Sequence, residues 1–217
     1  MVTYDFRGLF IHGNFFVEVL LMNSLVEKPK FTTRNITSIA VMAALSIVLV
    51  YLVRIPMFLP FLEYDPADIP IFITAFAFGP GVGFILTVIV SVLQGLTVSA
   101  SSGVIGILMH IVATGSFVLV AGNIYKRNKT RKNAVVALAV GVAVWTVMMV
   151  VWNIIITPIF MGVPREQVLT LIVPAILPFN LIKAGINAAI TFALYKSVGK
   201  LFRIPETPPK KQCTDEE

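Results

Sequence analysis

The chain has 217 residues, of which 57% are hydrophobic and only 13% are charged, and its mean hydropathy is +0.90. A soluble domain of this size could not bury so much apolar surface, so the composition indicates a single integral membrane domain. One cysteine, Cys213, and two histidines exclude an internal disulfide and a conventional histidine-based metal cluster. We therefore interpret the net charge of +6 as a signal that orients the chain in a bilayer, and not as a sign of nucleic-acid binding.

The two chain ends differ from the rest in composition. Residues 1–33 are apolar but interrupted by charged residues, so they cannot span a bilayer, and they lack the basic start and cleavage site of a signal peptide. Two interpretations stay open, an interfacial helix or an extension that precedes a natural start at Met22. Residues 204–217 form a polar tail that we expect in the cytoplasm. The membrane domain is therefore expected at residues 34–203.

Six apolar segments follow one another along the membrane domain. They cover residues 37–53, 68–78, 82–98, 104–124, 134–157 and 169–198. This pattern predicts an all-α integral membrane protein with six transmembrane helices. The second segment is the weakest, because its clear apolar run is only about ten residues long. It becomes a longer helix if Asp68 is its N-cap and Pro70 lies in its first turn.

Prolines mark several of the connections between these segments. Residues 54–68 contain three prolines and three acidic residues, so we predict an ordered loop there. Pro158 is expected to end the fifth helix, because proline lacks the N–H that a helix needs. Residues 159–168 should then form a loop that leads to the sixth helix.

The cations separate the two sides of the membrane. Residues 126–132 hold five cations, and further cations flank the first and last segments, whereas the opposite loops hold only Arg54 and Arg165. Loops rich in lysine and arginine stay in the cytoplasm, so both termini are predicted to be cytoplasmic. The acidic stretch 54–68 is then predicted to face outward.

Few polar side chains lie inside the apolar segments. They are Gln94, His110, Asn153, Asn180, Lys183 and Asn187. The first two, taken singly, favour simple helix–helix contacts. Asn180, Lys183 and Asn187 share one helix face. The helical rise places Asn153 at a depth similar to that of Asn180 and Lys183, so these three together predict a ligand pocket.

The side chains of this predicted pocket indicate the chemistry of its ligand. Amides donate and accept in one plane and lysine donates, so a planar heteroaromatic molecule with amide edges would suit them. We expect asparagine carbonyls to be the partners of Lys183, which is the only charge well inside any segment. The candidates for apolar faces are Phe58, Phe61, Tyr64 and Trp152.

Several catalytic patterns are absent from the sequence. It contains no GxxxxGK[ST], HExxH or GxSxG motif and no paired carboxylates inside the apolar segments. A proton relay would have only His110 available. We therefore predict that the chain is not an enzyme and has no ATP site of its own.

Small residues recur at a four-residue spacing on the first segment. Ala40 and Ala44 would allow close backbone approach by another helix. Two interpretations stay open: packing within this bundle, or docking of a partner membrane protein.

Two stretches resemble a known family. LEYDPADIPIFITAFAFGPGVGFILTVIVSVLQGL, at residues 62–96, resembles the first loop and the following helices of riboflavin-specific substrate-binding (S) components of energy-coupling factor (ECF) transporters. ILPFNLIKAGINAAI, at residues 176–190, resembles their last helix with its PFNxIK core. The resemblance covers about residues 35–203.

The resemblance implies a high-affinity riboflavin capture subunit of an ATP-driven vitamin importer in the bacterial cell membrane. The partners would be an ECF transmembrane subunit, two cytosolic ATPases and the lipid bilayer. Riboflavin would be cargo, bound from outside under the first outer loop, with no cofactor and no metal. The implied substrate-binding residues are Leu62, Tyr64, Gln94, Asn153, Asn180 and Lys183, and the implied docking residues are Ala40 and Ala44. The alternatives are an S component for another vitamin, such as thiamine or pantothenate, a membrane enzyme, or a membrane scaffold without a transport role.

Overall fold

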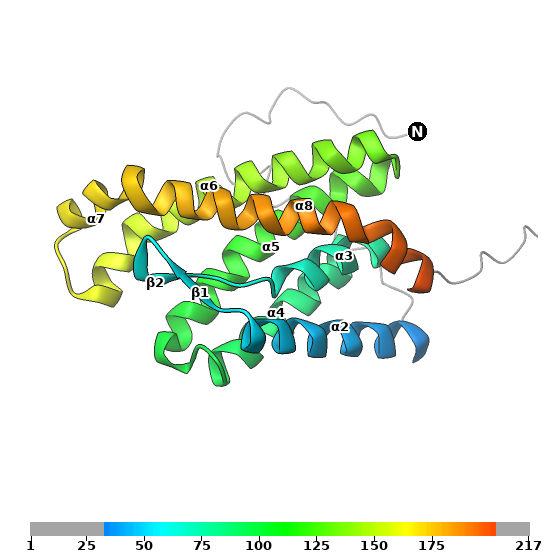
Figure 1. The fold of residues 1–217 in the computed structure, drawn as a ribbon, viewed down its shortest axis with the longest axis horizontal. Helices are drawn as coiled ribbons and strands as arrows, with labels where there is room; N and C mark the ends of the chain where they lie inside the picture. Colours follow the sequence, from blue (N-terminus) through cyan, green and yellow to red (C-terminus); the bar gives the residue numbers. More distant parts are fainter. Residues whose placement is uncertain (1–32, 203–217) are drawn as a thin grey trace, which may run out of the picture.

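The structure, a computed structural model, describes residues 33–202 (Figure 1). The predictions for the N-terminal extension and the polar tail lie outside the described residues. In chain order the elements are α2 (Thr33–Leu52), β1 (Ile55–Met57), β2 (Leu59–Tyr64), α3 (Asp68–Phe78), α4 (Pro80–Leu96), the 3₁₀ turn η2 (Ala100–Ser102), α5 (Gly103–Arg127), α6 (Arg131–Met161), α7 (Arg165–Leu171), the π-helical turn η3 (Ile172–Ile176) and α8 (Leu177–Phe202).

Within the described range the chain forms six helical rods, because α7, η3 and α8 run on without a break. Three of these rods, α5, α6 and α7–α8, are long and apolar enough to cross a membrane by length and composition. The other three are shorter apolar helices. With 11 residues α3 spans about 16 Å at 1.5 Å per residue, which is about half of a bilayer's hydrocarbon core. The six predicted helices are therefore present, but α3 is too short to cross a bilayer alone.

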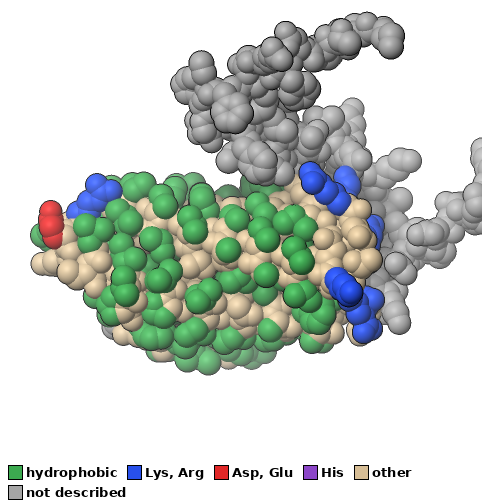
Figure 2. All heavy atoms as spheres, turned by 90° about the horizontal axis from the view of Figure 1, so that it is seen from above, with side chains coloured by type: hydrophobic (Ala, Val, Ile, Leu, Met, Phe, Trp, Pro, Cys, Tyr) green, Lys and Arg blue, Asp and Glu red, His purple; other side chains and the backbone are tan. Residues whose placement is uncertain are grey.

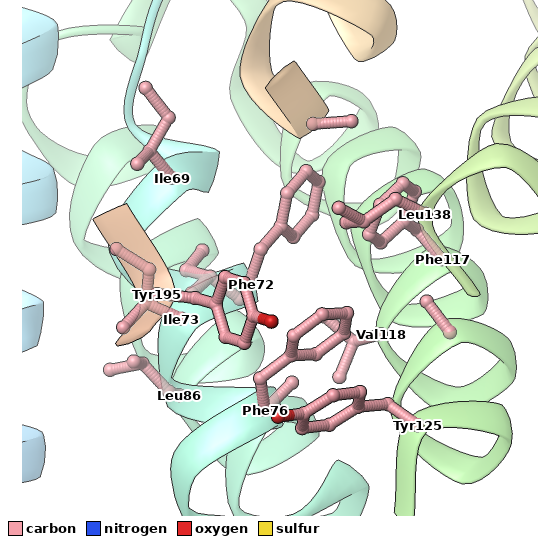
Figure 3. Packing of buried hydrophobic residues seen from close by; sticks show 14 of the residues in the cluster. Ile69, Phe72, Ile73, Phe76, Leu86, Phe117, Val118, Tyr125, Leu138 and Tyr195 are labelled. Atoms are coloured by element: carbon pink, nitrogen blue, oxygen red, sulfur yellow. The ribbon is translucent and has the colours of Figure 1, made fainter. Parts of the chain in front are cut away.

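The short helix α3 lies at the centre of the bundle, where most of its side chains are buried (Figure 3). Phe72 stacks on Phe117 of α5 with their ring centroids 3.8 Å apart. Phe76 stacks in the same way on Tyr125, with the centroids 4.3 Å apart. Stacked aromatic pairs add to the stabilisation from buried apolar area. This packing explains how so short a helix keeps its place.

Two glycines allow the tight connection between α3 and α4. Gly79 joins the two helices with φ of +100°, a conformation that side chains with a Cβ rarely adopt. One turn into α4, a Cβ built on Gly83 would lie 2.6 Å from the Cβ of Ala75. The two helices can approach so closely only because this position lacks a side chain.

The predicted loop at residues 54–68 instead contains an antiparallel β-hairpin, β1–β2. Phe58 lies in its turn with φ of +63°. The hairpin packs inward through Leu62 and Tyr64 against Ala175 and Phe179, near the start of α8. Successive side chains of a strand point to opposite faces, so one face of the hairpin can pack against the helices. This proline-containing stretch lies toward the α7 end of the bundle (Figure 1).

Two predicted helix limits are wrong. Pro158 does not end the fifth helix but lies inside α6, which continues to Met161. The helix runs less than one turn past the proline and ends at Gly162, which has φ of +65° and donates its N–H to the Pro158 carbonyl. The loop predicted for 159–168 is correspondingly short, since α7 begins at Arg165.

The surface separates apolar from charged side chains. Figure 2 shows hydrophobic side chains over the middle of the face and Lys and Arg side chains at its ends, with the larger groups at one end. Large side chains such as Val147, Val151 and Ile155 are exposed along α6. An apolar belt between polar ends is the surface expected of a protein in a bilayer.

Candidate ligand-binding site

A cavity of about 760 Å³ lies between the hairpin, α4, α5, α6 and the first half of α8. Its volume is within the range of about 300–1,000 Å³ that small-molecule sites usually have. Side chains from every one of these elements reach its wall.

Two buried amides lie on the wall of this cavity. Asn153 on α6 and Asn180 on α8 are each 1% exposed. Each NH₂ group donates to the carbonyl one turn earlier, at 2.7 and 2.8 Å. The Oδ1 of Asn153 accepts from Thr157 at 2.8 Å, and that of Asn180 accepts from Trp145 Nε1 at 3.4 Å. An amide has two donors and two lone pairs, so each retains one donor and one lone pair for a ligand.

Lys183 is held by a carboxylate on the cavity wall. Its Nζ lies 2.7 Å from Asp65 Oδ2 and donates more weakly, at 3.4 Å, to the Glu63 carbonyl oxygen. The Lys183 and Asp65 side chains are 12% and 15% exposed. The prediction that asparagine carbonyls would be the partners of Lys183 is therefore wrong. A buried ammonium is stabilised far better by a carboxylate than by a neutral carbonyl.

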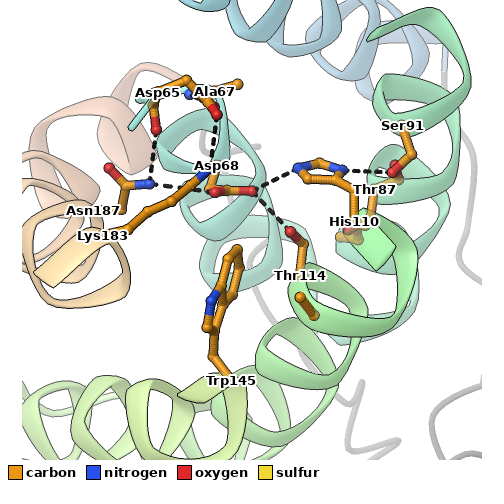
Figure 4. Close-up of polar contacts among 12 residues, drawn as sticks. Asp65, Ala67, Asp68, Thr87, Ser91, His110, Thr114, Trp145, Lys183 and Asn187 are labelled. Atoms are coloured by element: carbon orange, nitrogen blue, oxygen red, sulfur yellow. Dashed lines mark hydrogen bonds and ion pairs between the residues drawn. The ribbon is translucent and has the colours of Figure 1, made fainter. Parts of the chain in front are cut away.

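Asp68 is fully buried beside this pair (Figure 4). It is the first residue of α3, whose N-cap is Ala67, so the predicted capping role is wrong. Its Oδ1 accepts from Thr114 at 2.9 Å and lies 3.0 Å from His110 Nε2, and its Oδ2 accepts from Asn187 at 3.3 Å. These partners satisfy a carboxylate that would otherwise be costly to bury.

The imidazole of His110 connects Asp68 to the cavity. Its Nδ1 lies 2.6 Å from Ser91 Oγ, and both residues line the cavity. The Ser91 hydroxyl also lies 2.6 Å from the Thr87 carbonyl, to which it donates. His110 thus joins α5 to α3 and α4, which agrees with the helix–helix contact that the sequence favours for it alone.

Tyr64 lies beside the cavity rather than on its wall. Its hydroxyl donates to Asn187 Oδ1 at 3.1 Å, and Asn187 Nδ2 in turn donates to the Asp65 carbonyl at 3.2 Å. Burial, and after it the Asp65 carboxylate, raise the pKa of Tyr64 above its ordinary value. The phenol therefore stays neutral and keeps its donor role at neutral pH. Tyr64 anchors the hairpin to α8, whereas its neighbour Leu62 reaches the cavity.

An arginine also lines the cavity. Arg54 forms an ion pair with Glu63 and donates from Nη1 to the Val98 carbonyl at 2.7 Å. Gln94 lies on the wall nearby and is 7% exposed. Among the residues that the structure describes, nothing accepts a hydrogen bond from its Nε2. A buried donor without a partner is available for a ligand.

The structure brings most of the predicted binding residues to one cavity. The residues on its wall are Leu62, Gln94, Asn153, Asn180 and Lys183. Sequence reasoning missed Asp65, Ser91 and Trp145, which also line it. The signals for Asp65 were its position among the acidic residues of a stretch interpreted as outward-facing and its place in the stretch 62–96 that resembles the family.

The predicted apolar faces are mostly elsewhere. Phe58 is 54% exposed in the hairpin turn, and Trp152 is absent from the cavity wall. Phe160 and Phe179 line the cavity instead. The side chain of Phe61 lies outside the described part of the chain. Across residues 33–202 no group of three or more His, Cys, Asp or Glu side chains could hold a metal ion.

The two alanines with four-residue spacing face away from the bundle. Ala40 and Ala44 are both exposed on α2, whereas Ala43 between them is 8% exposed and packs inside. Packing within this bundle, the first of the two open interpretations, does not occur at these two positions.

Comparisons with known proteins agree on one family. A family model described as the substrate-specific component of ECF transporters matches residues 34–195. The riboflavin transporter RibU of Staphylococcus aureus (strain TCH60) is 25% identical over 78% of this chain and 93% of its own length. RibU of Streptococcus thermophilus (strain ATCC BAA-250 / LMG 18311) is 30% identical over 84% of this chain and 89% of its own. The riboflavin transporter FmnP of Bacillus subtilis (strain 168) is 30% identical over 62% of this chain and 74% of its own length.

The fold agrees with a solved structure as well. The S component of a bacterial ECF transporter superposes with a TM-score of 0.68 at 26% identity. The match covers 79% of this chain and 99% of the solved one.

Proposed function

Because this chain belongs to the substrate-specific components of ECF transporters, as the sequence resemblance indicated, we propose that it captures riboflavin in the cavity under the β1–β2 hairpin. The family is one of transport proteins, which confirms that the chain is not an enzyme. Riboflavin is then the cargo of the protein and not a cofactor.

One observation carries the choice of ligand. Asn153 and Asn180, each with one donor and one lone pair left over, line one cavity together with Lys183. The pyrimidine half of a flavin carries all the carbonyl and N–H groups of the ring, so this half would meet the three side chains. The dimethylbenzene half and the sugar-like chain would extend toward the apolar walls and Gln94. Three curated relatives named as riboflavin transporters support the same choice.

The orientation in the membrane is proposed from charge. The α5–α6 turn with its five cations lies at the end of the bundle opposite the hairpin and α7 (Figure 1). The positive-inside bias then places this turn and both termini in the cytoplasm. The cavity is lined in part by the hairpin, so in this orientation riboflavin would enter from outside.

Energy for uptake has to come from other subunits. The sequence has no phosphate-binding loop, so this chain would depend on a transmembrane partner and two cytosolic ATPases. The exposed small side chains of Ala40 and Ala44 support α2 as the surface on which that partner docks.

The test is the visible absorption spectrum of the protein purified without added ligand. We expect a bound yellow chromophore, identified as riboflavin by chromatography after the protein is denatured. A colourless protein that remains colourless after incubation with riboflavin and desalting would contradict the proposal. Stabilisation by thiamine or pantothenate instead would favour a component for another vitamin.

A further inference from the structure

Two carboxylates and one ammonium lie close together beside the cavity. Asp65 and Lys183 form a nearly buried ion pair, and the fully buried Asp68 lies beside them (Figure 4). The formal charge of these three groups is therefore −1. Of the lysines and arginines on the cavity wall, Lys183 contacts Asp65 and Arg54 pairs with Glu63, while His110 lies 3.0 Å from Asp68.

The carboxylate of Asp65 is fixed in its position. Its Oδ1 accepts the backbone N–H of Ala67 at 3.2 Å, while Oδ2 holds Lys183. Its carbonyl oxygen accepts from Asn187. Three separate contacts hold this residue, so a ligand that reaches Lys183 meets an ammonium that is already neutralised.

This arrangement has a consequence for the ligand. An uncharged carbonyl or ring nitrogen can accept a second N–H of Lys183 while Asp65 keeps the first, because an ammonium has three donors. A negatively charged group would gain little from the compensated lysine. It would also approach two carboxylates in a region of low dielectric, where like charges repel strongly.

We propose that Asp65 is a specificity-determining residue. By neutralising Lys183, it makes this part of the cavity select an uncharged ligand edge and reject an anionic one. The inference rests on the proposed binding of riboflavin. It adds that the ligand group next to Lys183 on α8 must be uncharged. It also separates riboflavin from vitamins that present a carboxylate.

Riboflavin itself offers the probe, because its charge depends on its redox state. The oxidised molecule is uncharged, whereas the two-electron-reduced molecule is an anion at mildly alkaline pH, with the charge on its pyrimidine half. The difference between the midpoint potentials of bound and free riboflavin reports the ratio of the protein's affinities for the oxidised and the reduced molecule. For a two-electron couple a tenfold ratio is about 30 mV.

The experiment compares spectroelectrochemical titrations of riboflavin-saturated protein in detergent at mildly alkaline pH. The parent should bind oxidised riboflavin more tightly, so that its bound potential lies below that of free riboflavin. In Asp65→Asn the affinity ratio should shift toward reduced riboflavin by at least about tenfold. The midpoint potential of bound riboflavin should therefore rise by about 30 mV or more. Glu166→Gln is the matched control, since it removes an exposed carboxylate of α7 that is not on the cavity wall. It should change the ratio less than threefold.

An unchanged ratio in Asp65→Asn, or an equal rise in Glu166→Gln, would overturn the assignment. If Asp65→Asn does not fold, the double variant Asp65→Asn/Lys183→Gln leaves no unpaired charge at this position. The affinity ratio of this double variant should match that of the parent within threefold. A large shift of the ratio toward reduced riboflavin would also overturn the assignment. A parent protein that binds no riboflavin contradicts the proposed function before any variant is measured.

Discussion

The Lys183 ammonium of α8 lies 2.7 Å from the carboxylate of Asp65, which follows the β1–β2 hairpin and is 118 residues away in the sequence. This ion pair joins the hairpin over the cavity to the last helix. Any substitution of Lys183 therefore acts on the ligand and on the hairpin at once, and the two effects have to be separated.

We predict that Lys183→Met weakens riboflavin binding by roughly ten- to a hundredfold. The loss of one charge-assisted hydrogen bond is expected to remove about 1.5–3 kcal/mol of binding free energy. The same substitution leaves Asp65 without its partner, so the melting temperature should fall too. Equilibrium titration with riboflavin and thermal unfolding in detergent measure the two effects.

The double variant Asp65→Asn/Lys183→Met separates them. It removes both charges, so stability should recover toward the parent while riboflavin binding stays weak. If Lys183→Met binds riboflavin like the parent, Lys183 is not a ligand.

Asn153→Leu and Asn180→Leu should each weaken binding, and their effects should not add. Both amides would hold the same rigid ring from two different helices, so the two substitutions share one partner. The measurement is the riboflavin affinity of both single variants and the double variant. Unchanged affinity in either single variant removes that residue from the site, and loss of folded protein indicates a structural role.

Asp68→Asn should destabilise the protein more than it alters the cavity. The carboxylate accepts from Thr114 and Asn187 and contacts His110, and hydrogen bonds to a charged group contribute about 1.5–3 kcal/mol each. We expect a clearly lower melting temperature. Glu166→Gln, an exposed carboxylate on α7, is the control and should melt like the parent. Equal melting of both variants would show that the Asp68 network does not hold the helices together.

Ala40→Trp or Ala44→Trp should abolish uptake and leave riboflavin binding nearly intact. Both side chains are exposed on α2, outside the cavity wall, so a bulky ring would block only close approach by a partner helix. Ala139→Trp makes the same change on an exposed position of α6 and should leave uptake unchanged. Normal uptake with retained partner binding in the α2 variants would exclude α2 as the docking surface.

Much of the fold could be predicted from the sequence, because hydropathy along a helix is a local property. The long apolar stretches of α5 and α6 were sufficient to predict these two helices. Pro158 was misjudged because it was expected to end the helix, whereas α6 continues past it to Met161 and ends at Gly162. The hairpin was missed because its prolines and acidic residues are typical of a loop, and its apolar face becomes visible only against α8.

The site was predictable only in part, for a different reason. Polar residues inside apolar segments stand out, so Asn153, Asn180 and Lys183 could be found. Asp65 and Asp68 lie in a polar stretch of the sequence, where a carboxylate carries no such signal. Their burial depends on contacts with residues 42 to 122 positions away, which no local pattern encodes.

The most direct test of the central claim is a titration of riboflavin fluorescence with the purified, ligand-free protein, carried out in parallel with a folded Asn180→Leu variant. The account predicts saturable quenching by the parent at one riboflavin per chain, with a markedly weaker affinity in the variant. Saturable binding that is identical in both proteins would place riboflavin outside this cavity, and the absence of quenching by the folded parent would contradict riboflavin as the ligand.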